Sequence, residues 1–357
     1  MKVVMMSRYD QLGASSRLRM FQYRAALEAQ GLQIHCEPLF SDAYLRAFYA
    51  GKSTRALTIS AMRTRTKAML RLRDADVIWL EKEALPWVPW LIERQLMPRG
   101  AKVIADYDDA VFHNYDLHKK ALVRRVLGQK IDRVMQSADV VTAGNAYLAQ
   151  RAEKAGARKV EVVPTVVDGA AYSVARRPDP DGRVRIGWIG SPSTWRAYMD
   201  PMLPLLLPLA RKHDALLRAV GAAPMDAQAG LELIDWSEAR EIELIQGMDI
   251  GVMPLDDSPW ARGKCGYKLI QYMACGVPVV ASPVGVNSQI VTHGVNGFLA
   301  STDVQWREAI DRLLGDAALR QRMGKAGRDT FETQYSLQIQ APRIAGLMHQ
   351  LNGTFSR

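Results

Sequence analysis

The chain has 357 residues, of which 24% are charged and 48% are hydrophobic, so its length predicts two ordinary domains and its composition excludes a disordered protein. No apolar stretch is long enough to span a bilayer, because the longest candidates, residues 85–92 and 201–210, are short and contain prolines. The net charge is +10, and residues 1–175 supply +9 of it, with 27 Lys and Arg against 18 Asp and Glu. This excess predicts an anionic partner for the first half: a membrane surface, a phosphorylated substrate or nucleic acid.

The N-terminal residues MKVVMMSRYD predict an opening strand, because their apolar run is too short for a signal peptide. The three cysteines, Cys36, Cys265 and Cys275, are odd in number and do not have the spacing of a disulfide framework or a zinc site. We therefore expect a chain that is not exported and that works in a reducing cytoplasm.

Short apolar runs alternate with helical patterns through the first half, which predicts parallel βαβ units. The first helix is expected over residues 17–30, with Ser15 or Ser16 as its cap and Gly31 as its stop. It follows a loop that leaves the first strand. The expected strands of this half are residues 2–6, 33–40, 76–80, 102–105, 139–143 and 160–167.

A second series of strands and helices follows a stretch without apolar periodicity. We place an N-terminal domain at residues 1–170, a linker at 171–183, a C-terminal domain at 184–335 and a last helix, which could cross back to the N-terminal domain, at 336–357. Two Rossmann-like domains facing a central cleft are the predicted α/β architecture. The expected strands of the second half are residues 185–189, 216–220, 249–254, 278–282 and 297–300.

The first strand of the second domain runs into Gly190 and Ser191 and then into a helix. In this layout the backbone N–H groups at the helix N-terminus can hold a phosphate. A dinucleotide fingerprint is not present, because the later glycines of G-x-G-x-x-G are missing. The alternative is a capped turn with no ligand.

Three cations, Arg262, Lys264 and Lys268, surround the start of a helix expected at residues 267–275. The helix dipole is already positive there, so each cation would be disfavoured by about 0.3–1 kcal/mol unless an anion lies among them. A bound phosphate group would supply that anion. Gln271 lies one turn beyond Lys268 on the same face and could contact the same ligand. A solvated basic loop with a surface glutamine is the alternative.

Residues 249–300, which contain DIGVMPL, KLIQYMACGVPVVASPVG and HGVNGFLA in that order, resemble the donor-nucleotide region of the retaining GT-B glycosyltransferases. The order and spacing of these pieces carry the resemblance, since PVVAS and GVNG alone are weak. The resemblance also covers residues 190–196 and, more weakly, the N-terminal half. It implies a GT-B fold, which is two Rossmann-like domains with a cleft between them.

The resemblance also implies the residues of the donor site. The family's Glu-x7-Glu pair is absent, because Gly263 stands at the first glutamate and Gln271 at the second. Gln271 could still accept a hydrogen bond from a ribose hydroxyl, and we expect Gln271→Glu to be tolerated. Lys268 and Arg196 would bind the donor diphosphate, without a metal or another cofactor. The implied donor-binding residues are Gly190, Ser191, Arg196, Arg262, Lys264, Lys268 and Gln271.

Asp106, Asp108 and Asp109 follow an apolar strand of the first domain, at the edge where open α/β sheets bind ligands. The resemblance places Asp108 where the family often has a histidine lining the cleft, with His113 nearby, and Asp108, His113 and Lys268 are the implied catalytic residues. The alternatives are a metal-binding D-x-D, the nucleophile loop of a haloacid-dehalogenase-like phosphatase, or a helix-capping acidic turn.

The loop at residues 9–17 follows the first strand and opens on the same edge. By the resemblance, Gly13, Ser15, Ser16 and Arg17 would bind the acceptor. The alternative is a flexible connector with a helix cap.

Residues 46–73, from Arg46 to Arg73, hold eight Lys and Arg and no Asp or Glu. On a helical wheel Arg63, Lys67 and Arg71 share one side, and Arg65 interrupts the apolar side. This pattern predicts a helix that lies on an anionic membrane. Nucleic acid is the competing partner, but no aromatic platform or binding module accompanies the charges. An ordinary solvated helix is the third interpretation.

The resemblance implies a retaining glycosyltransferase that transfers a sugar from a UDP- or GDP-linked donor to a glycan or polyprenyl-linked acceptor. The role expected for it is in bacterial polysaccharide or glycolipid assembly, on the cytoplasmic face of the cell membrane, with no nucleic-acid partner. A non-catalytic nucleotide or glycan binder that has lost both glutamates is the main alternative, and a phosphatase is a weaker one.

Overall fold

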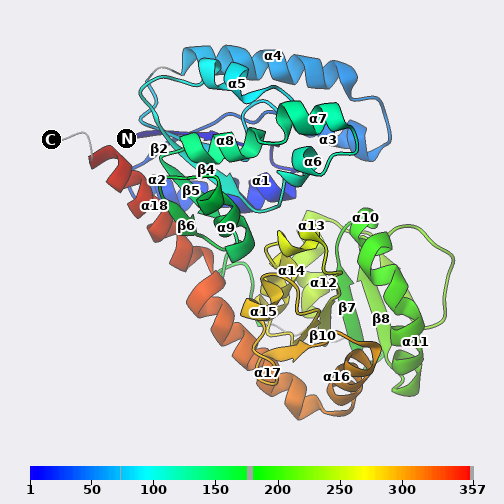
Figure 1. The fold of residues 1–357 in the computed structure, drawn as a ribbon. Helices are drawn as coiled ribbons and strands as arrows, with labels where there is room; N and C mark the ends of the chain where they lie inside the picture. The colour runs from blue at the N-terminus through cyan, green and yellow to red at the C-terminus, as the bar shows by residue number, and fades with distance from the viewer. Residues whose placement is uncertain (73, 175–179, 354–357) are drawn as a thin grey trace. The chain divides into compact units, whose positions relative to one another are not determined.

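A computed structural model describes residues 1–72, 74–174 and 180–353 and shows two compact α/β units (Figure 1). The first unit contains Met1–Thr165, Gly263–Cys265 and the chain from Leu337 onward. The second contains Val166–Arg262 and Gly266–Ser336. Parts of three sequence-based assignments lie outside the described residues: Arg73 of the basic segment, 175–179 of the linker and 354–357 of the last helix.

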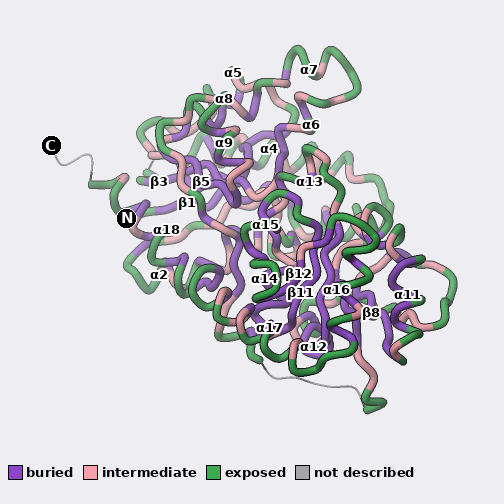
Figure 2. Tube along the Cα trace, turned by 60° about the horizontal axis from the view of Figure 1, so that its bottom comes forward, coloured by how far each residue is buried: buried purple, intermediate pink, exposed green. Residues whose placement is uncertain are grey.

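The first unit is built on a six-stranded sheet with the order β2-β1-β3-β4-β5-β6, in which every neighbouring pair is parallel. All residues of β3 and β5 are buried, as expected for a parallel sheet covered by helices on both faces (Figure 2). The strands are β1 (Lys2–Met6), β2 (Gln33–Cys36), β3 (Val77–Glu81), β4 (Lys102–Tyr107), β5 (Val140–Ala143) and β6 (Val160–Val162).

The helix predicted at residues 17–30 is wrong in its start and its continuity. The structure has α1 (Ala14–Arg19), a 3-10 turn (Phe21–Tyr23) and α2 (Arg24–Glu28), and neither Ser15 nor Ser16 caps α1. The other helices of this unit are α3 (Asp42–Tyr49), α4 (Arg55–Arg71), α5 (Trp90–Leu96), α6 (His113–Asp116), α7 (Ala121–Leu127), α8 (Lys130–Ser137), α9 (Ala146–Lys154) and α18 (Leu337–Gly353), which packs on α2 and β3.

The second unit has a parallel sheet with the order β12-β11-β10-β7-β8-β9. The sequence did not predict β9, a half-exposed edge strand. The strands are β7 (Arg185–Ile189), β8 (Leu216–Val220), β9 (Leu231–Ile234), β10 (Ile250–Met253), β11 (Val279–Ala281) and β12 (Gly297–Leu299).

A helical run of mixed type follows β7, with α10 (Pro192–Thr194), a π-helix (Trp195–Met199), a 3-10 turn (Asp200–Met202) and α11 (Leu203–Lys212). The chain is helical again from residue 303, as predicted. The remaining helical elements are a 3-10 turn (Glu238–Arg240), α12 (Glu241–Gln246), α13 (Pro259–Arg262), α14 (Tyr267–Ala274), α15 (Asn287–Ile290), α16 (Asp303–Gly315), α17 (Ala317–Thr330) and a π-helix (Phe331–Tyr335).

The strand orders show where each unit can bind a ligand. The chain reverses direction across the sheet between β1 and β3 in the first unit and between β7 and β10 in the second. Open α/β sheets bind ligands at such a switch point, at the carboxyl ends of the strands. The loops that follow these strands are therefore the expected place of a binding site. Among the described residues, no helix has an apolar stretch that could cross a bilayer.

Candidate functional site

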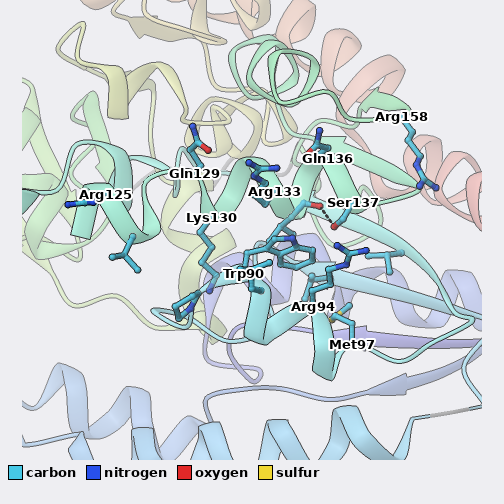
Figure 3. Close-up of a pocket in the computed structure, with 16 residues that line it drawn as sticks. Trp90, Arg94, Met97, Arg125, Gln129, Lys130, Arg133, Gln136, Ser137 and Arg158 are labelled. Atoms are coloured by element: carbon cyan, nitrogen blue, oxygen red, sulfur yellow. Dashed lines mark hydrogen bonds between the residues drawn. The ribbon is translucent and has the colours of Figure 1, made fainter. Parts of the chain in front are cut away.

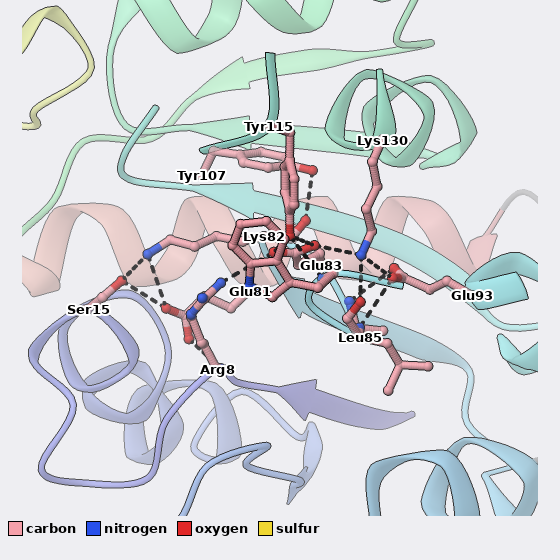
Figure 4. A network of polar contacts seen from close by, with 12 residues as sticks. Arg8, Ser15, Glu81, Lys82, Glu83, Leu85, Glu93, Tyr107, Tyr115 and Lys130 are labelled. Carbon is pink, nitrogen blue, oxygen red and sulfur yellow. Dashed lines mark hydrogen bonds and ion pairs between the residues drawn. The ribbon is translucent and has the colours of Figure 1, made fainter. Parts of the chain in front are cut away.

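Loops at the carboxyl ends of β1, β3 and β4 bring together a polar cluster in the first unit (Figure 4). Lys82 Nζ lies 2.8 Å from Asp108 Oδ1 and 2.9 Å from Ser15 Oγ. The Ser15 hydroxyl lies 2.6 Å from Asp108 Oδ2 and 2.8 Å from Glu81 Oε1, and its single proton can go to one of them at a time. Ser15 and Asp108, both singled out from the sequence, therefore meet around Lys82, which was not.

Lys82 is held by an unusual backbone turn. Its φ is 67°, and the Glu83 N–H donates to the Glu81 carbonyl at 2.8 Å, so Lys82 is the centre of a γ-turn. The Lys82 N–H donates to the Asp106 carbonyl at 2.9 Å, and its carbonyl accepts from the Tyr107 hydroxyl at 2.9 Å. A left-handed lysine costs about 1–3 kcal/mol and persists only where its surroundings fix it. The turn thereby directs the Lys82 side chain to Asp108.

The two adjacent carboxyls of the β4 loop differ in protonation. Burial disfavours the ionised form of Asp108, but the charge of Lys82 and hydrogen bonds from Lys82 and Ser15 outweigh it and lower the pKa of Asp108. Burial and the negative charge of Asp108 raise the pKa of Asp109 to about 6, against the opposing charges of Lys82 and Lys264. Burial also opposes the charge of Lys82, yet Asp108 and Glu81 raise the pKa of Lys82. The edge therefore holds one carboxylate with a lowered pKa, Asp108, and one carboxyl with a pKa raised to about 6, Asp109.

Asp106 has a structural role that is incompatible with the phosphatase alternative. It is fully buried, and its two oxygens accept from Arg19 Nη2 at 2.6 Å and Nε at 2.9 Å. Thr142 Oγ1 also donates to it at 2.6 Å. A nucleophile needs an oxygen that substrate can reach, and Asp106 presents none. The interpretation of this loop as a phosphatase nucleophile is therefore wrong.

The predicted acceptor loop is fastened by hydrogen bonds. Ser16 is buried, donates to Glu81 Oε2 at 2.5 Å and accepts from the Tyr9 N–H at 2.9 Å. This use of its hydroxyl explains why Ser16 does not cap α1. A Cβ on Gly13 would lie 2.2 Å from the Tyr9 Cβ, so the loop needs a glycine there. Arg17, which follows Ser16 in α1, is half-buried. Among these four residues, Ser15 is the one that reaches Lys82 and Asp108.

A second buried charge group adjoins the first (Figure 4). Lys130 Nζ lies 2.6 Å from Glu83 Oε2 and 3.0 Å from Glu93 Oε2, and donates to the Leu85 carbonyl at 2.5 Å. The Tyr115 hydroxyl lies 2.9 Å from both oxygens of Glu83. Sequence reasoning missed Glu81, Lys82 and Glu83. The signal was present, because a run of charges directly after a buried strand is the pattern that identified the β4 loop.

His113 has both ring nitrogens occupied by neighbouring side chains. Nδ1 lies 2.8 Å from Asp116 Oδ1, and Nε2 lies 2.8 Å from the Tyr147 hydroxyl. The ring packs edge-on against Phe112, with centroids 4.5 Å apart. This geometry differs from the one expected for a catalytic histidine, because neither nitrogen is open to a ligand in this structure.

In the second unit, Trp188 of β7 brings two predicted donor-site residues together. A Cβ on Gly190 would lie 2.5 Å from the Trp188 ring, and Lys268 Nζ lies 5.4 Å from the centroid of that ring. The Trp188 ring also packs edge-on against Trp195 at 5.2 Å. Trp188 is buried and was not singled out from the sequence. Gly190 and Lys268 therefore both lie against the Trp188 ring at the carboxyl end of β7.

The turn after β7 satisfies its own backbone donors. The Gly190 N–H donates to the Val220 carbonyl at 3.0 Å. Ser191 and Thr194 form a capping box, in which the Ser191 N–H donates to Thr194 Oγ1 at 3.0 Å and the Thr194 N–H donates to Ser191 Oγ at 3.4 Å. The prediction of a capped turn describes this geometry better than that of an open phosphate cradle. The N–H groups of Gly190, Ser191 and Thr194 are therefore already bonded within the protein.

Gln271 is buried in the interior of the second unit. It is 1% exposed, and its amide donates to Glu241 Oε1 at 2.7 Å and to the Tyr172 hydroxyl at 2.9 Å. Glu241 also accepts from Trp236 Nε1 at 2.7 Å. A carboxylate at position 271 would face Glu241 at this distance. We therefore reverse the expectation for Gln271→Glu, which should be unfavourable because two buried carboxylates would meet.

The predicted basic cluster does not stay together. Arg262 forms a two-point ion pair with Asp257, at 2.6 and 2.8 Å, so a protein carboxylate already supplies its anion. Lys264 groups with the first unit, where Asn145 Nδ2 donates to its carbonyl at 2.9 Å. Arg196 is exposed. Arg262 therefore needs no bound anion, which corrects the expectation for the three cations, and Lys268 lies over the Trp188 ring.

The described residues contain no group of three or more His, Cys, Asp and Glu side chains arranged to hold a metal ion. The D-x-D interpretation of Asp106 and Asp108 would need both carboxylates to face one ion. Instead Asp106 is bound to Arg19 and Asp108 to Lys82.

Comparisons with known proteins agree with this architecture. Residues 183–316 match the family model of Glycosyl transferases group 1. Over 224 residues the chain is 24% identical to a protein of Bacillus subtilis named as the teichuronic acid biosynthesis glycosyltransferase TuaH, with 58% of this chain and 54% of TuaH covered. Over 152 residues it is 32% identical to a GDP-mannose-dependent phosphatidylinositol monomannoside mannosyltransferase of Corynebacterium glutamicum, with 42% and 39% covered.

Among solved structures, HepE of Anabaena in complex with UDP-glucose has the same fold, with a TM-score of 0.71 over 98% of this chain and 100% of HepE at 14% identity. The chain spans about half or less of the length of the two curated relatives named above. The two six-stranded parallel sheets with their helices form the GT-B fold.

Proposed function

Because residues 183–316 match the family model of Glycosyl transferases group 1, we propose that the chain is a glycosyltransferase that uses a UDP- or GDP-linked sugar. The observation that carries this proposal is the position of Lys268, held over Trp188 beside Gly190 at the carboxyl end of β7. A cation at the switch point of the sheet suits the diphosphate of a nucleotide sugar. The relatives named for GDP-mannose and UDP-glucose support a nucleotide-sugar donor.

In the proposed reaction Lys268 stabilises the charge that develops on the leaving diphosphate. The bond between the sugar carbon and the diphosphate oxygen breaks, and the acceptor oxygen bonds to the same carbon. The acceptor proton passes to the departing diphosphate on the same face, so the configuration is retained without a protein nucleophile. Because Lys268 supplies positive charge, we expect donor binding without added divalent metal, and a chelator should leave it unchanged.

The first unit would bind the acceptor at the carboxyl ends of β1, β3 and β4. Asp108 is held ionised by Lys82 and Ser15, so it can accept hydrogen bonds from sugar hydroxyls. Asp109, whose pKa is about 6, can exchange a proton near neutral pH. The teichuronic acid and phosphatidylinositol relatives support an acceptor that is a glycan or a lipid-linked sugar, in polysaccharide or glycolipid assembly.

The basic helix α4 would hold the protein on the cytoplasmic face of the membrane. Arg63, Lys67 and Arg71 are exposed on it. Arg65, which interrupts the apolar side, is buried and donates to the Ser7 carbonyl at 2.6 Å and the Glu37 carbonyl at 2.7 Å, so it fixes α4 to the sheet. Replacing Arg63, Lys67 and Arg71 with glutamate should abolish sedimentation with anionic vesicles. Equal binding to neutral vesicles would contradict an electrostatic attachment.

The proposed activity is tested by incubating the full chain with UDP- and GDP-linked sugars and measuring release of the nucleoside diphosphate, with and without a chelator. Release from one donor, faster with a bacterial glycolipid fraction, is the expected result. Failure to bind any nucleoside diphosphate would overturn the proposal.

A second candidate is a non-catalytic nucleotide or glycan binder. It is favoured by the two positions where the family has glutamates. Gln271 is buried, and a Cβ on Gly263 would lie 2.5 Å from the Ala110 Cβ, which leaves no room for a longer side chain. Tight binding of UDP or GDP with no turnover of any donor would select this candidate.

A further inference from the structure

The loop between β3 and α5 holds a second strained residue besides Lys82. Among the described residues, Lys82, Trp87 and Asp214 are the non-glycine residues with positive φ, and the first two lie in this one loop. The φ of Trp87 is 66°. A bulky side chain is rarely found in this left-handed region, because its Cβ crowds the backbone. Such residues cluster at functional sites, where the surrounding structure fixes them.

Trp87 stands where the turn favours glycine. The Val88 N–H donates to the Leu85 carbonyl at 3.2 Å, and Pro86 and Trp87 are the two central residues of that turn. Proline at the first central position and a positive φ at the second are the pattern of a type II turn, in which the second residue is usually glycine. Burial does not account for the tryptophan either, because it is 52% exposed.

Buried polar groups hold this strained turn in place. The Trp87 N–H donates to the Tyr115 hydroxyl at 3.1 Å, and that hydroxyl lies 2.9 Å from both oxygens of Glu83. Lys130 Nζ lies 2.6 Å from Glu83 on its other side (Figure 4). Since Glu83 directly follows Lys82, the same buried groups fix both strained residues. The turn is therefore built onto the polar cluster at the carboxyl edge of the first sheet.

The Trp87 ring is fixed by edge contacts and has a polar group beside it. Its centroid lies 5.0 Å from that of Tyr115, at 70° between the planes, and 5.8 Å from that of His118, at 78°. His118 Nδ1 accepts from the Lys120 N–H at 3.1 Å, so in the neutral ring the proton is on Nε2. No hydrogen bond to this Nε2 is found among the residues that the structure describes. A rigid, half-exposed indole thus lies next to a hydrogen-bond donor.

We propose that a sugar ring of the acceptor stacks on Trp87 while His118 Nε2 donates to one of its hydroxyls. A sugar ring has an apolar C–H face and a rim of hydroxyl groups, which matches an aromatic surface with a donor at its edge. A tryptophan that is already fixed loses little conformational freedom on binding. This inference rests on the proposed function and deepens it, because it has the protein recognise the glycan part of the acceptor and not a lipid part.

The test separates the ring from the fold, because Trp87→Gly introduces the residue that the turn favours. Its melting temperature should be no more than about 2 °C below that of the wild type. The KM for the bacterial glycolipid fraction should rise about tenfold while kcat changes less than about twofold, since stacking is equal in the ground and transition states. Trp87→Tyr keeps an aromatic ring and should raise this KM by about threefold or less.

The matched control is Leu91→Ala. Leu91 is 71% exposed on α5, four residues from Trp87, and lines a separate groove of α5, α7 and α8 (Figure 3). This variant should have the wild-type KM. An equal rise of KM in Leu91→Ala would show that the acceptor is held by its lipid part and would overturn the inference. A melting temperature of Trp87→Gly lowered by more than about 5 °C would also overturn it, since the ring would then serve the fold.

A binding measurement without donor keeps this inference apart from the proposed function. Oligosaccharides released from the same glycolipid fraction are the probe, and saturation-transfer NMR should show contact between their C–H protons and the wild type. Trp87→Gly should lose these signals and Leu91→Ala should keep them. Signals that depend on Trp87, with no nucleoside diphosphate released from any donor, would support the sugar site and contradict the glycosyltransferase. Unchanged signals and KM in Trp87→Gly would overturn the sugar site alone.

Discussion

The two units place different chemistry at the same edge of their sheets. In the first unit the carboxyl ends of β3 and β4 carry buried ion pairs, Arg19 with Asp106 and Lys82 with Asp108. In the second unit the corresponding edge has Gly190, a self-capped turn, Trp188 and the cation Lys268. The polar groups of the first unit are therefore also part of its stability, whereas Lys268 can be removed without leaving a buried charge. Mutations should separate fold from function in the second unit and not in the first.

The largest expected effect is on the stability of the first unit. Arg19→Met leaves the buried Asp106 carboxylate without its partner and should destabilise the protein by about 3–5 kcal/mol, because an uncompensated buried charge is costly. Chemical denaturation followed by circular dichroism measures this loss. The matched control is Arg24→Met, since Arg24 forms an exposed i,i+4 pair with Glu28. It should change the stability very little, because an exposed ion pair is screened by solvent. An equal loss of stability in the two variants would show that the buried ion pair of Arg19 does not stabilise the first unit more than an exposed pair does.

The second prediction concerns catalysis without loss of stability. Lys268→Ala should lower kcat by roughly two to three orders of magnitude, the scale of losing a preorganised charge at a developing anion, with a smaller effect on the donor KM. The melting temperature should stay within a degree or two, since Lys268 is not buried. Lys325→Ala, at an exposed position of α17, is the control. Full turnover by Lys268→Ala would show that this lysine does not meet the diphosphate.

The third prediction tests whether the buried hydrogen bonds of Gln271 in the second unit contribute to stability, as the buried ion pairs of the first unit do. Gln271→Glu should destabilise by about 2–3 kcal/mol at pH 8, because the new carboxylate would face Glu241, and by less at pH 5, where the pair can share a proton. Exchanging the two residues, as Gln271→Glu/Glu241→Gln, keeps one carboxylate and should recover much of the loss. A Gln271→Glu variant as stable as the wild type at pH 8 would contradict this geometry.

The smallest expected effect comes from Asp109, whose folded pKa of about 6 exceeds the unfolded value of about 3.9. The folded state binds the proton more tightly, so stability falls as pH rises from about 4 to about 6 and is then constant. Asp109→Asn removes this loss and should stabilise the folded protein by about 1–2 kcal/mol at pH 7.5. The gain is smaller than for a fully buried carboxyl, because the Asp109 side chain is partly exposed. The gain should vanish near pH 4. A gain that is the same at both pH values would exclude titration as its cause.

Much of the fold could be predicted because most strands are buried runs with clear ends. The bounds predicted for β1, β7 and β8 are those observed. The edge strand β9 was not predicted. It pairs on one side only and its residues are half-exposed, so no continuous apolar run marks it in the sequence. The predicted cap at Ser16 failed because its hydroxyl bonds to Glu81, 65 residues away, which its sequence neighbours cannot reveal.

Only those residues of the candidate site that follow a strand in the chain could be predicted from the sequence. Ser15 and Asp108 follow strands, so their place at the sheet edge could be inferred. The pairing of Arg262 with Asp257 depends on how the loop before α13 folds back on that helix, which residue spacing alone does not determine. Helical spacing correctly placed Gln271 one turn from Lys268, but Tyr172 and Glu241, which bury its amide, come from distant segments.

Helix α18 belongs to the first unit although it follows the whole of the second in the chain. During synthesis the ribosome must therefore translate residues 166–336 before the partner of α2 emerges. At about 5–20 residues per second this delay is roughly 10–40 s. The nascent first unit has to wait with the surface that receives Ile344 and Met348 uncovered, while the second unit can already fold. Chaperone demand in the cell should consequently peak midway through translation and fall once the last helix has docked.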